Sequence, residues 1–308
     1  MPEPSPYNAR HADAAFEYCA KMTAAHYENF PVASLFLPAE KRPYIQAVYA
    51  FSRHADDFAD EGDLPDADRL ALLDDWENRL DGAYNGEADH PVFIALAETV
   101  RKNRIPKEYL TSLLSAFRQD VVKSRYATLD ELLDYCTRSA NPVGRIVLHI
   151  FGHREEDLGK MSDCVCTALQ LTNFWQDLGT DRERDRLYLP ADEMERFGYS
   201  ERGWRAGLVD DRFRELMCSL VGMTRDLFDA GAALPDRVER DILLELRFVW
   251  LGGMSILREI EKSGYDVFTR RPALTRTGKI MVVARGFLMK DISRFGRPKK
   301  RKKAWDLT

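Results

Sequence analysis

Two short aspartate-rich segments contain the residues of this chain that are best suited to chemistry. Each places two carboxylates four residues apart, Asp56 with Asp60 and Asp177 with Asp181. On a helix this spacing puts both carboxylates of a pair on one face, about one turn apart. Both segments lie in stretches that otherwise read as buried helix, where unpaired negative charge is costly. We therefore expect a cation between the two pairs.

Two acidic pairs facing each other across a cavity indicate magnesium and a diphosphate. Magnesium is usually held by one or two carboxylates together with waters and phosphate oxygens of the substrate. Gln170 and Asn173 precede Asp177 by two turns and one turn on about the same face, and could supply neutral oxygen ligands or hydrogen bonds. The alternative is an ordinary solvated helix face whose aspartates pair with nearby arginines. The apolar and aromatic surroundings of both pairs favour the metal site.

The spacing of apolar residues predicts an all-α protein. Intervals of three and four recur, as in Leu70, Leu73, Trp76 and Leu80, whereas the alternation typical of β-strands is nearly absent. No composition shift or Gly/Ser linker divides the chain, so we expect one domain over residues 1–293 and a basic tail over 294–308. Helices are predicted near residues 10–27, 41–61, 66–84, 91–103, 106–125, 129–152, 156–185, 209–232, 236–262 and 276–292.

Composition limits the class of protein. A hydrophobic content of 45% over 308 residues is enough for a sizeable core, and the net charge of -5 does not favour nucleic acid as a partner. Five cysteines form no disulfide or zinc framework, and the N-terminal residues contain no apolar signal segment. These features predict a cytoplasmic globular protein.

The basic tail has two interpretations. Six cations lie between Arg297 and Lys303, just before Trp305. Such a run is usually a solvated, disordered tail. The alternative is a peripheral contact with anionic lipid of the inner membrane, with Trp305 at the interface.

Two long motifs, residues 49–61 and 169–190, resemble the squalene/phytoene synthase family, the all-helical enzymes that join prenyl diphosphates head to head. The resemblance extends from about His26 to Arg271. It implies the isoprenoid synthase fold, a single domain whose helices surround a central apolar cavity with the two Asp-rich motifs facing each other. It also implies a prenyl diphosphate substrate and Mg²⁺ as the cofactor.

The resemblance assigns expected roles to individual residues. The four aspartates Asp56, Asp60, Asp177 and Asp181 would be catalytic and, with Asn173, would be associated with the metal. Tyr265 and Arg271 resemble a late segment of the family that closes over the diphosphate. The residues expected to bind substrate are His26, Asn29, Arg53, Gln170, Asn173, Tyr265 and Arg271.

Within the family, residues 28–34 and 139–145 resemble the hydroxysqualene synthases of bacterial hopanoid biosynthesis (the HpnC type). Asn141-Pro142 stands where relatives usually have an Ala-Gly-containing helix start, and Gln176 occupies a position that is often an arginine in contact with diphosphate. The implied reaction converts presqualene diphosphate and water to hydroxysqualene and diphosphate, alongside companion enzymes of squalene synthesis.

Two alternatives stay open. One is head-to-head condensation of two farnesyl diphosphates, or of geranylgeranyl diphosphates, by an enzyme of the same family. The other is a non-catalytic lipid-binding or scaffold protein that keeps the fold. The intact aspartates of both motifs argue against the second, because a scaffold has no need of buried charge.

Overall fold

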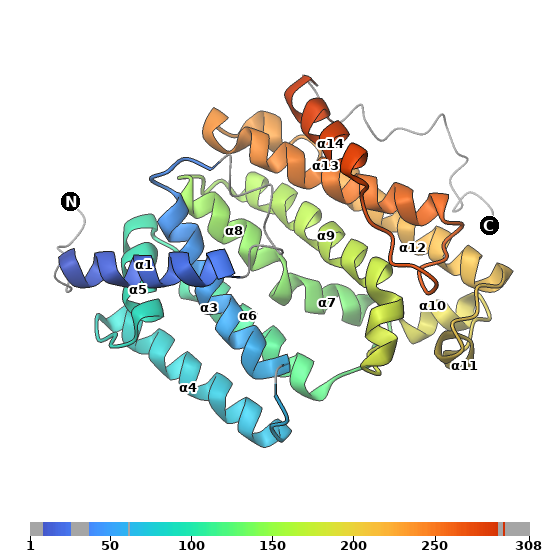
Figure 1. The fold of residues 1–308 in the computed structure, drawn as a ribbon, viewed down its shortest axis with the longest axis horizontal. Helices are drawn as coiled ribbons and strands as arrows, with labels where there is room; N and C mark the ends of the chain where they lie inside the picture. The colour runs from blue at the N-terminus through green and yellow to red at the C-terminus, as the bar shows by residue number, and fades with distance from the viewer. Residues whose placement is uncertain (1–8, 26–36, 61, 289–291, 293–308) are drawn as a thin grey trace.

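Apolar residues spaced three and four apart form helices along most of the chain (Figure 1). The computed structural model describes residues 9–25, 37–60, 62–288 and 292. Over these ranges there is no β-strand, and one isolated parallel bridge joins Arg125 to Leu187. The prediction of an all-α protein is confirmed.

The observed helices follow the predicted ones closely, apart from one division and two short helices within residues 191–205 that were not predicted. The first half of the chain forms α1 (Ala9–Ala25), α3 (Arg42–Asp60), α4 (Asp66–Asn85), α5 (Pro91–Asn103), α6 (Lys107–Val122), α7 (Leu129–Ser139) and α8 (Asn141–Ile150). The second half forms α9 (Glu156–Glu183), α10 (Ala191–Arg196), α11 (Glu201–Arg205), α12 (Asp211–Ala230), the 3-10 helix η2 (Leu234–Arg237), α13 (Arg240–Lys262) and α14 (Arg276–Leu288). None of the described helices is long and apolar enough to cross a bilayer.

The prediction of one helix over residues 129–152 is wrong. The chain breaks at Ala140, and α8 begins at Asn141 with Pro142 in its first turn. Proline has no N–H, and inside a helix its ring clashes with the carbonyl four residues earlier, whereas the first turn tolerates it. Pro142 therefore ends α7 and starts a second helix in a new direction.

Two hydrophobic cores stabilise opposite halves of the molecule. One core contains Phe51, Trp76 and Phe93 and is built mainly by α1 and α3 to α6. The other contains Trp175 and Trp250 and is built mainly by α7, α9, α12 and α13. Figure 1 shows α4 and α5 on one side, α10 to α12 on the other, and α8 and α9 across the middle. The two cores therefore meet along α8 and α9.

Buried indoles fix the helices of the second core to one another. Trp175 Nε1 on α9 donates to Thr224 Oγ1 on α12 at 2.8 Å. Trp250 Nε1 on α13 donates to the carbonyl of Phe228 on α12 at 2.7 Å. Each bond satisfies a polar atom inside an apolar core, where an unpaired donor would cost about 1–3 kcal/mol. These contacts fix α9, which carries the second acidic motif.

Candidate active site

The first acidic motif lies on one face of α3. Ala55 and Ala59 are buried in the core on the opposite face, whereas Arg53, Asp56 and Asp60 are partly accessible. Because residues 53, 56 and 60 recur at intervals of three and four, they form a single stripe along the helix. The core packing of α3 thus directs the carboxylates to the boundary between the two cores, which we call the seam.

The second acidic motif forms a matching stripe on α9. Trp175 and Leu178, which point to other faces, are fully buried in the second core. The stripe lies along the part of α9 that the core does not cover. Its members are Gln170, Asn173, Asp177 and Asp181, none of which is buried.

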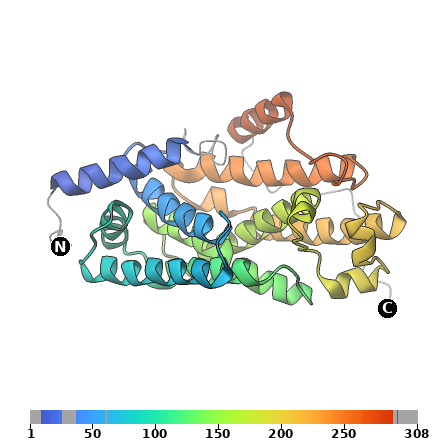
Figure 2. The same cartoon turned by 60° about the horizontal axis from the view of Figure 1, so that its bottom comes forward.

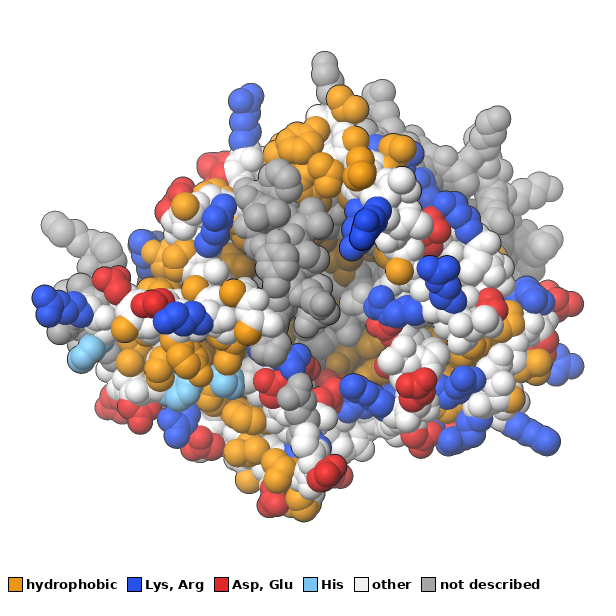
Figure 3. Space-filling model, viewed as in Figure 1, with side chains coloured by type: hydrophobic (Ala, Val, Ile, Leu, Met, Phe, Trp, Pro, Cys, Tyr) orange, Lys and Arg blue, Asp and Glu red, His pale blue; other side chains and the backbone are white. Residues whose placement is uncertain are grey.

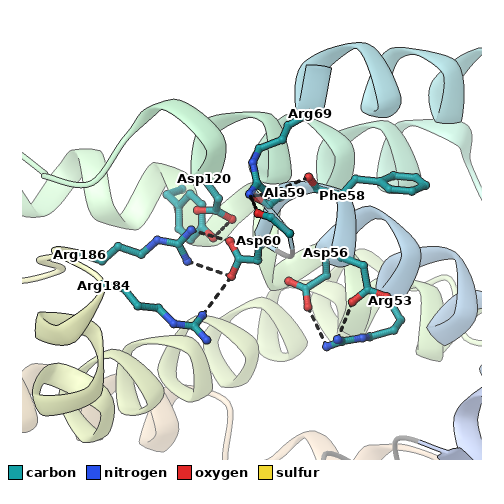
Figure 4. Close-up of polar contacts among 12 residues, drawn as sticks. Arg53, Asp56, Phe58, Ala59, Asp60, Arg69, Asp120, Arg184 and Arg186 are labelled. Atoms are coloured by element: carbon teal, nitrogen blue, oxygen red, sulfur yellow. Dashed lines mark hydrogen bonds and ion pairs between the residues drawn. The ribbon is translucent and has the colours of Figure 1, made fainter. Parts of the chain in front are cut away.

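Arginines lie against the carboxylates of the first motif (Figure 4). Arg53 Nη1 is 3.1 Å from Asp56 Oδ2, and Arg53 Nη2 is 2.5 Å from Asp57 Oδ1. These pairs are local, because all three residues belong to one or two turns of α3. Arg53 therefore lies beside the acidic motif, where an anionic ligand of the site could contact its guanidinium.

Asp60 is bound from the other side of the seam. Arg186 Nη1 donates to Asp60 Oδ2 at 3.0 Å and Arg186 Nη2 lies 2.5 Å from Asp60 Oδ1, a two-pronged contact. Arg184 Nη1 lies 3.5 Å from the same carboxylate. Both arginines follow directly after α9, so they connect the second motif to the first (Figure 4). The two Asp-rich motifs therefore face each other across the seam.

Arg271 reaches the second motif from the segment between α13 and α14. Its Nη2 donates to Asp177 Oδ2 at 3.1 Å, and its Nε donates to Asp177 Oδ1. The neighbouring Pro272 carbonyl accepts a bond from the buried side chain of Gln176. Gln176 therefore holds this segment against α9. The arginine that relatives often have at this position suggested instead a side chain in contact with diphosphate.

Gly179 lets the same segment lie directly on α9. A Cβ at this position would stand 2.9 Å from the carbonyl oxygen of Val267 and 3.3 Å from Cα of Phe268. Both atoms belong to the backbone, so a side chain could be accommodated only if the segment moved. The glycine inside the D-L-G-T-D sequence is thus a packing requirement that positions Arg271.

The pKa of Asp181 differs strongly from its ordinary value. Burial, and then the negative charge of Asp177, raise the pKa of the Asp181 carboxyl to about 7, although Arg186 and Arg184 act in the opposite direction. The ionised form of Asp181 is therefore unfavourable while Asp177 is also ionised on the same partly buried face. A cation at this face would relieve the repulsion.

Asp120, on α6, joins the site without having been predicted. Its Oδ2 accepts a hydrogen bond from the Tyr135 hydroxyl at 2.8 Å, and its inaccessible Oδ1 has no hydrogen-bond partner among the described residues. Burial raises the pKa of the Asp120 carboxyl to about 7, and the charges of Asp60 and Asp56 add to this. The only sequence signal is a lone acid near the end of an apolar-patterned helix, which is too common to single out.

The remaining predicted residues fall in different places. His26, Asn29 and the tail from residue 294 lie outside the described residues. Tyr265 lies in the turn after α13 with a left-handed φ of 64° and packs against the second core. Asp185, which follows Asp181 by four residues, pairs with Arg125 at 2.7 Å.

The surface around the seam combines charge with apolar character. Figure 3 shows acidic and basic side chains mixed near the middle of this face, with apolar side chains visible deeper between them. Beside it, a cavity of about 390 Å³ lies between the end of α13 and residues 269–275, with Arg271 in its wall. Most of the residues that line this cavity are polar or charged.

Comparison with known proteins identifies the family of this chain. The squalene/phytoene synthase family matches residues 23–278, and the chain belongs to that family of enzymes. The phytoene synthase of Arthrospira platensis is 31% identical over 280 residues, which cover 87% of this chain and 90% of the relative. The hydroxysqualene synthase of Zymomonas mobilis is 44% identical over 175 residues, which cover 56% of this chain and 57% of the relative.

Solved structures confirm the fold. The squalene synthase HpnC of Alicyclobacillus acidocaldarius has a TM-score of 0.80 and 39% identity, covering 84% of this chain and 97% of the relative. A dehydrosqualene synthase in complex with a ligand has a TM-score of 0.81 and 24% identity, covering 90% of this chain and 97% of the relative. At that lower identity the second likeness concerns the fold alone. The chain therefore has the isoprenoid synthase fold.

Substitution Gly179→Ala should destabilise the protein by about 1–3 kcal/mol, because the new Cβ meets backbone and not a movable side chain. Gly222→Ala on α12 is the matched control, since nothing lies within 4 Å of its added Cβ. The control should gain up to about 1 kcal/mol from helix propensity. Urea unfolding measures both, and equal effects of the two substitutions would contradict the close approach.

Substitution Asp120→Asn should stabilise the protein more at pH 8 than at pH 5. The carboxyl has a pKa of about 7 when folded and an ordinary value of 3.8, so its ionisation disfavours the folded state increasingly as the pH rises through this range. We expect the gain in unfolding free energy at pH 8 to exceed that at pH 5 by about 1–3 kcal/mol. Exposed Asp211→Asn on α12 is the control, and a pH-independent effect of Asp120→Asn would contradict the assignment.

Proposed function

We propose that this enzyme converts presqualene diphosphate and water to hydroxysqualene and diphosphate, with Mg²⁺ as cofactor. The observation that carries the proposal is the order of the sequence identities. A hydroxysqualene synthase is 44% identical over about half of this chain, and the HpnC structure is 39% identical over 84% of it. The phytoene synthase of Arthrospira platensis is 31% identical. Over the aligned residues the chain is thus more identical to this hydroxysqualene synthase and to HpnC than to that phytoene synthase, and this difference supports the proposal.

The donor set of the site fits magnesium. The seam presents carboxylate and amide oxygens, the hard ligands that Mg²⁺ prefers. The raised pKa of Asp181 supports a cation there, because burial and the Asp177 carboxylate make its charge unfavourable. Among the described residues no cluster of three or more acidic, histidine or cysteine side chains could hold a metal ion by itself, so the proposed ion would also need oxygens of the substrate or of water. The proposed ligands are Asp56, Asp60, Asn173, Asp177 and Asp181.

The bound metal would offset the negative charge that develops on the departing diphosphate. The chain's own part in this is to bind and orient the diphosphate through guanidinium groups. Arg53 and Arg271 lie at the two acidic motifs, and Arg184 lies between them with its side chain 65% exposed. Guanidinium groups match phosphate oxygens in charge and in geometry. We therefore assign diphosphate binding to these arginines.

The proposed reaction breaks the bond between the substrate carbon and the diphosphate oxygen, and the electron pair leaves with diphosphate. The resulting cyclopropylcarbinyl cation rearranges, a water oxygen bonds to carbon, and that water loses one proton. Aromatic rings near the seam could stabilise the cation through their faces. Phe174 and Tyr188 stack with centroids 3.9 Å apart, and Tyr135 lies 6.0 Å from Phe174. These rings lie next to the acidic stripe of α9 and to Asp120.

Presqualene diphosphate, a diphosphate ester of two joined farnesyl units, must itself be supplied by a condensing enzyme. This requirement supports companion enzymes of squalene synthesis. The competing candidate, condensation of farnesyl or geranylgeranyl diphosphates by this chain itself, is supported by the 31% identity with a phytoene synthase over most of the chain. The two candidates differ in substrate and in the origin of the oxygen in the product.

Purified protein with Mg²⁺ and presqualene diphosphate should form hydroxysqualene. In ¹⁸O-labelled water the hydroxyl should carry the label, because the oxygen comes from solvent and not from the diphosphate ester. Parallel reactions contain farnesyl diphosphate with and without NADPH, or geranylgeranyl diphosphate, and mass spectrometry identifies the products. Consumption of farnesyl or geranylgeranyl diphosphate with presqualene diphosphate left intact would refute the proposal.

Substitution Asp56→Asn or Asp177→Asn should lower turnover about a thousandfold or more, since each removes a proposed metal ligand. Circular dichroism should show an unchanged helical fold. Asp75→Asn on α4 is the matched control: Asp75 also pairs with an arginine one turn away, Arg79, at 2.8 Å, but lies on an exposed helix surface. Normal activity in both motif variants would remove the metal site from the mechanism.

A further inference from the structure

Helix α14 has an apolar face that the rest of the described structure covers only in part, at Phe287, whose ring packs edge-on against Phe248. Val282 and Gly286 point inward, and Gly286 lies directly against the ring of Phe248 on α13. On the opposite side the large apolar residues are exposed. They are Ile280 (68% exposed), Met281 (51%), Phe287 (53%) and Leu288 (81%).

The exposed residues form one continuous stripe. Positions 280, 281, 284, 287 and 288 recur at intervals of three and four, so Ala284 lies between the two exposed pairs. A solvent-facing surface of an ordinary globular helix is polar, and a run of exposed large apolar groups marks an interaction surface. Figure 2 shows α14 on the outside of α13, and Figure 3 shows a patch of apolar side chains in its region.

The charge around this stripe identifies the kind of partner. Helix α14 contains Arg276, Lys279 and Arg285 and no acidic residue. The sequence that follows it, residues 289–308, contains eight Lys or Arg and two Asp. An apolar helix face flanked by cations suits a membrane surface with anionic lipid, where apolar side chains enter the acyl region and cations contact headgroups. Positive charge both on the helix and in the sequence after it favours an anionic surface of this kind.

We propose that the apolar face of α14 is the surface by which this protein binds anionic membranes. This goes beyond attraction by the basic tail, because it assigns the insertion step to Ile280, Met281, Phe287 and Leu288. Arg271, at the second acidic motif, precedes α14 by only four intervening residues. A short segment therefore connects α14 to the acidic seam. The proposal holds whichever prenyl diphosphate the enzyme uses.

Flotation of the full-length protein with vesicles tests the proposal. Wild type should bind phosphatidylglycerol/phosphatidylcholine vesicles and should bind pure phosphatidylcholine vesicles much less. The double variant Ile280→Ser/Leu288→Ser should bind the anionic vesicles roughly tenfold more weakly for each side chain removed. Val122→Ser and Leu208→Ser, which remove apolar side chains that are 64% and 49% exposed elsewhere, should bind like wild type.

Three outcomes would overturn the proposal. One is wild-type binding that is no stronger with anionic than with neutral vesicles. Another is unchanged binding by the α14 double variant, which would leave the basic tail as the sole attachment. The third is a wild-type dimer that the double variant converts to monomer in light scattering without any change in vesicle binding, which would make the face an interface between two copies. Circular dichroism of each variant verifies that the fold is retained.

Discussion

The constraint that governs this structure is negative charge held between two apolar cores. Carboxylates at a partly buried seam are unfavourable unless cationic groups reach them. Arg186 meets this requirement by binding Asp60 from across the seam with both of its terminal nitrogens. That contact joins the segment after α9 to the end of α3, so one charge pair connects the two halves of the molecule at the site.

Helix α9 serves the core and the site at once. Its apolar faces place Trp175 and Leu178 fully inside the second core, and this fixes the direction in which the Asp177 stripe points. Because Gly179 has no side chain, the segment that brings Arg271 to Asp177 can lie directly against the helix at this point. The long helix therefore has three distinct faces. One packs in the core, one carries the charged residues, and one lies against the backbone of the segment that contains Arg271.

Periodicity explains why so much was predictable from sequence. The helices and both acidic stripes follow from apolar intervals of three and four, since these fix which residues share a face. The contact of Arg186 with Asp60 was not predictable, because it joins residues 126 positions apart. The effect of Asp56 and Asp60 on Asp120 was not predictable either, because it depends on how α3 and α6 pack. The break at Pro142 was readable in principle, but the continuous apolar pattern on both sides of it concealed the change of direction.

Charge balance explains why a cation and a diphosphate belong together at such a site. The described seam contains six carboxylates and four guanidinium groups: Asp56, Asp57, Asp60, Asp120, Asp177 and Asp181 with Arg53, Arg184, Arg186 and Arg271. The raised pKa values of two of these carboxyls, caused by burial and then by neighbouring carboxylates, reflect the excess of negative charge. A diphosphate increases that excess, and the arginines are already engaged with carboxylates. Stable binding of the diphosphate therefore requires added positive charge, and a divalent cation at the carboxylates would also release guanidinium groups to bind the phosphate oxygens.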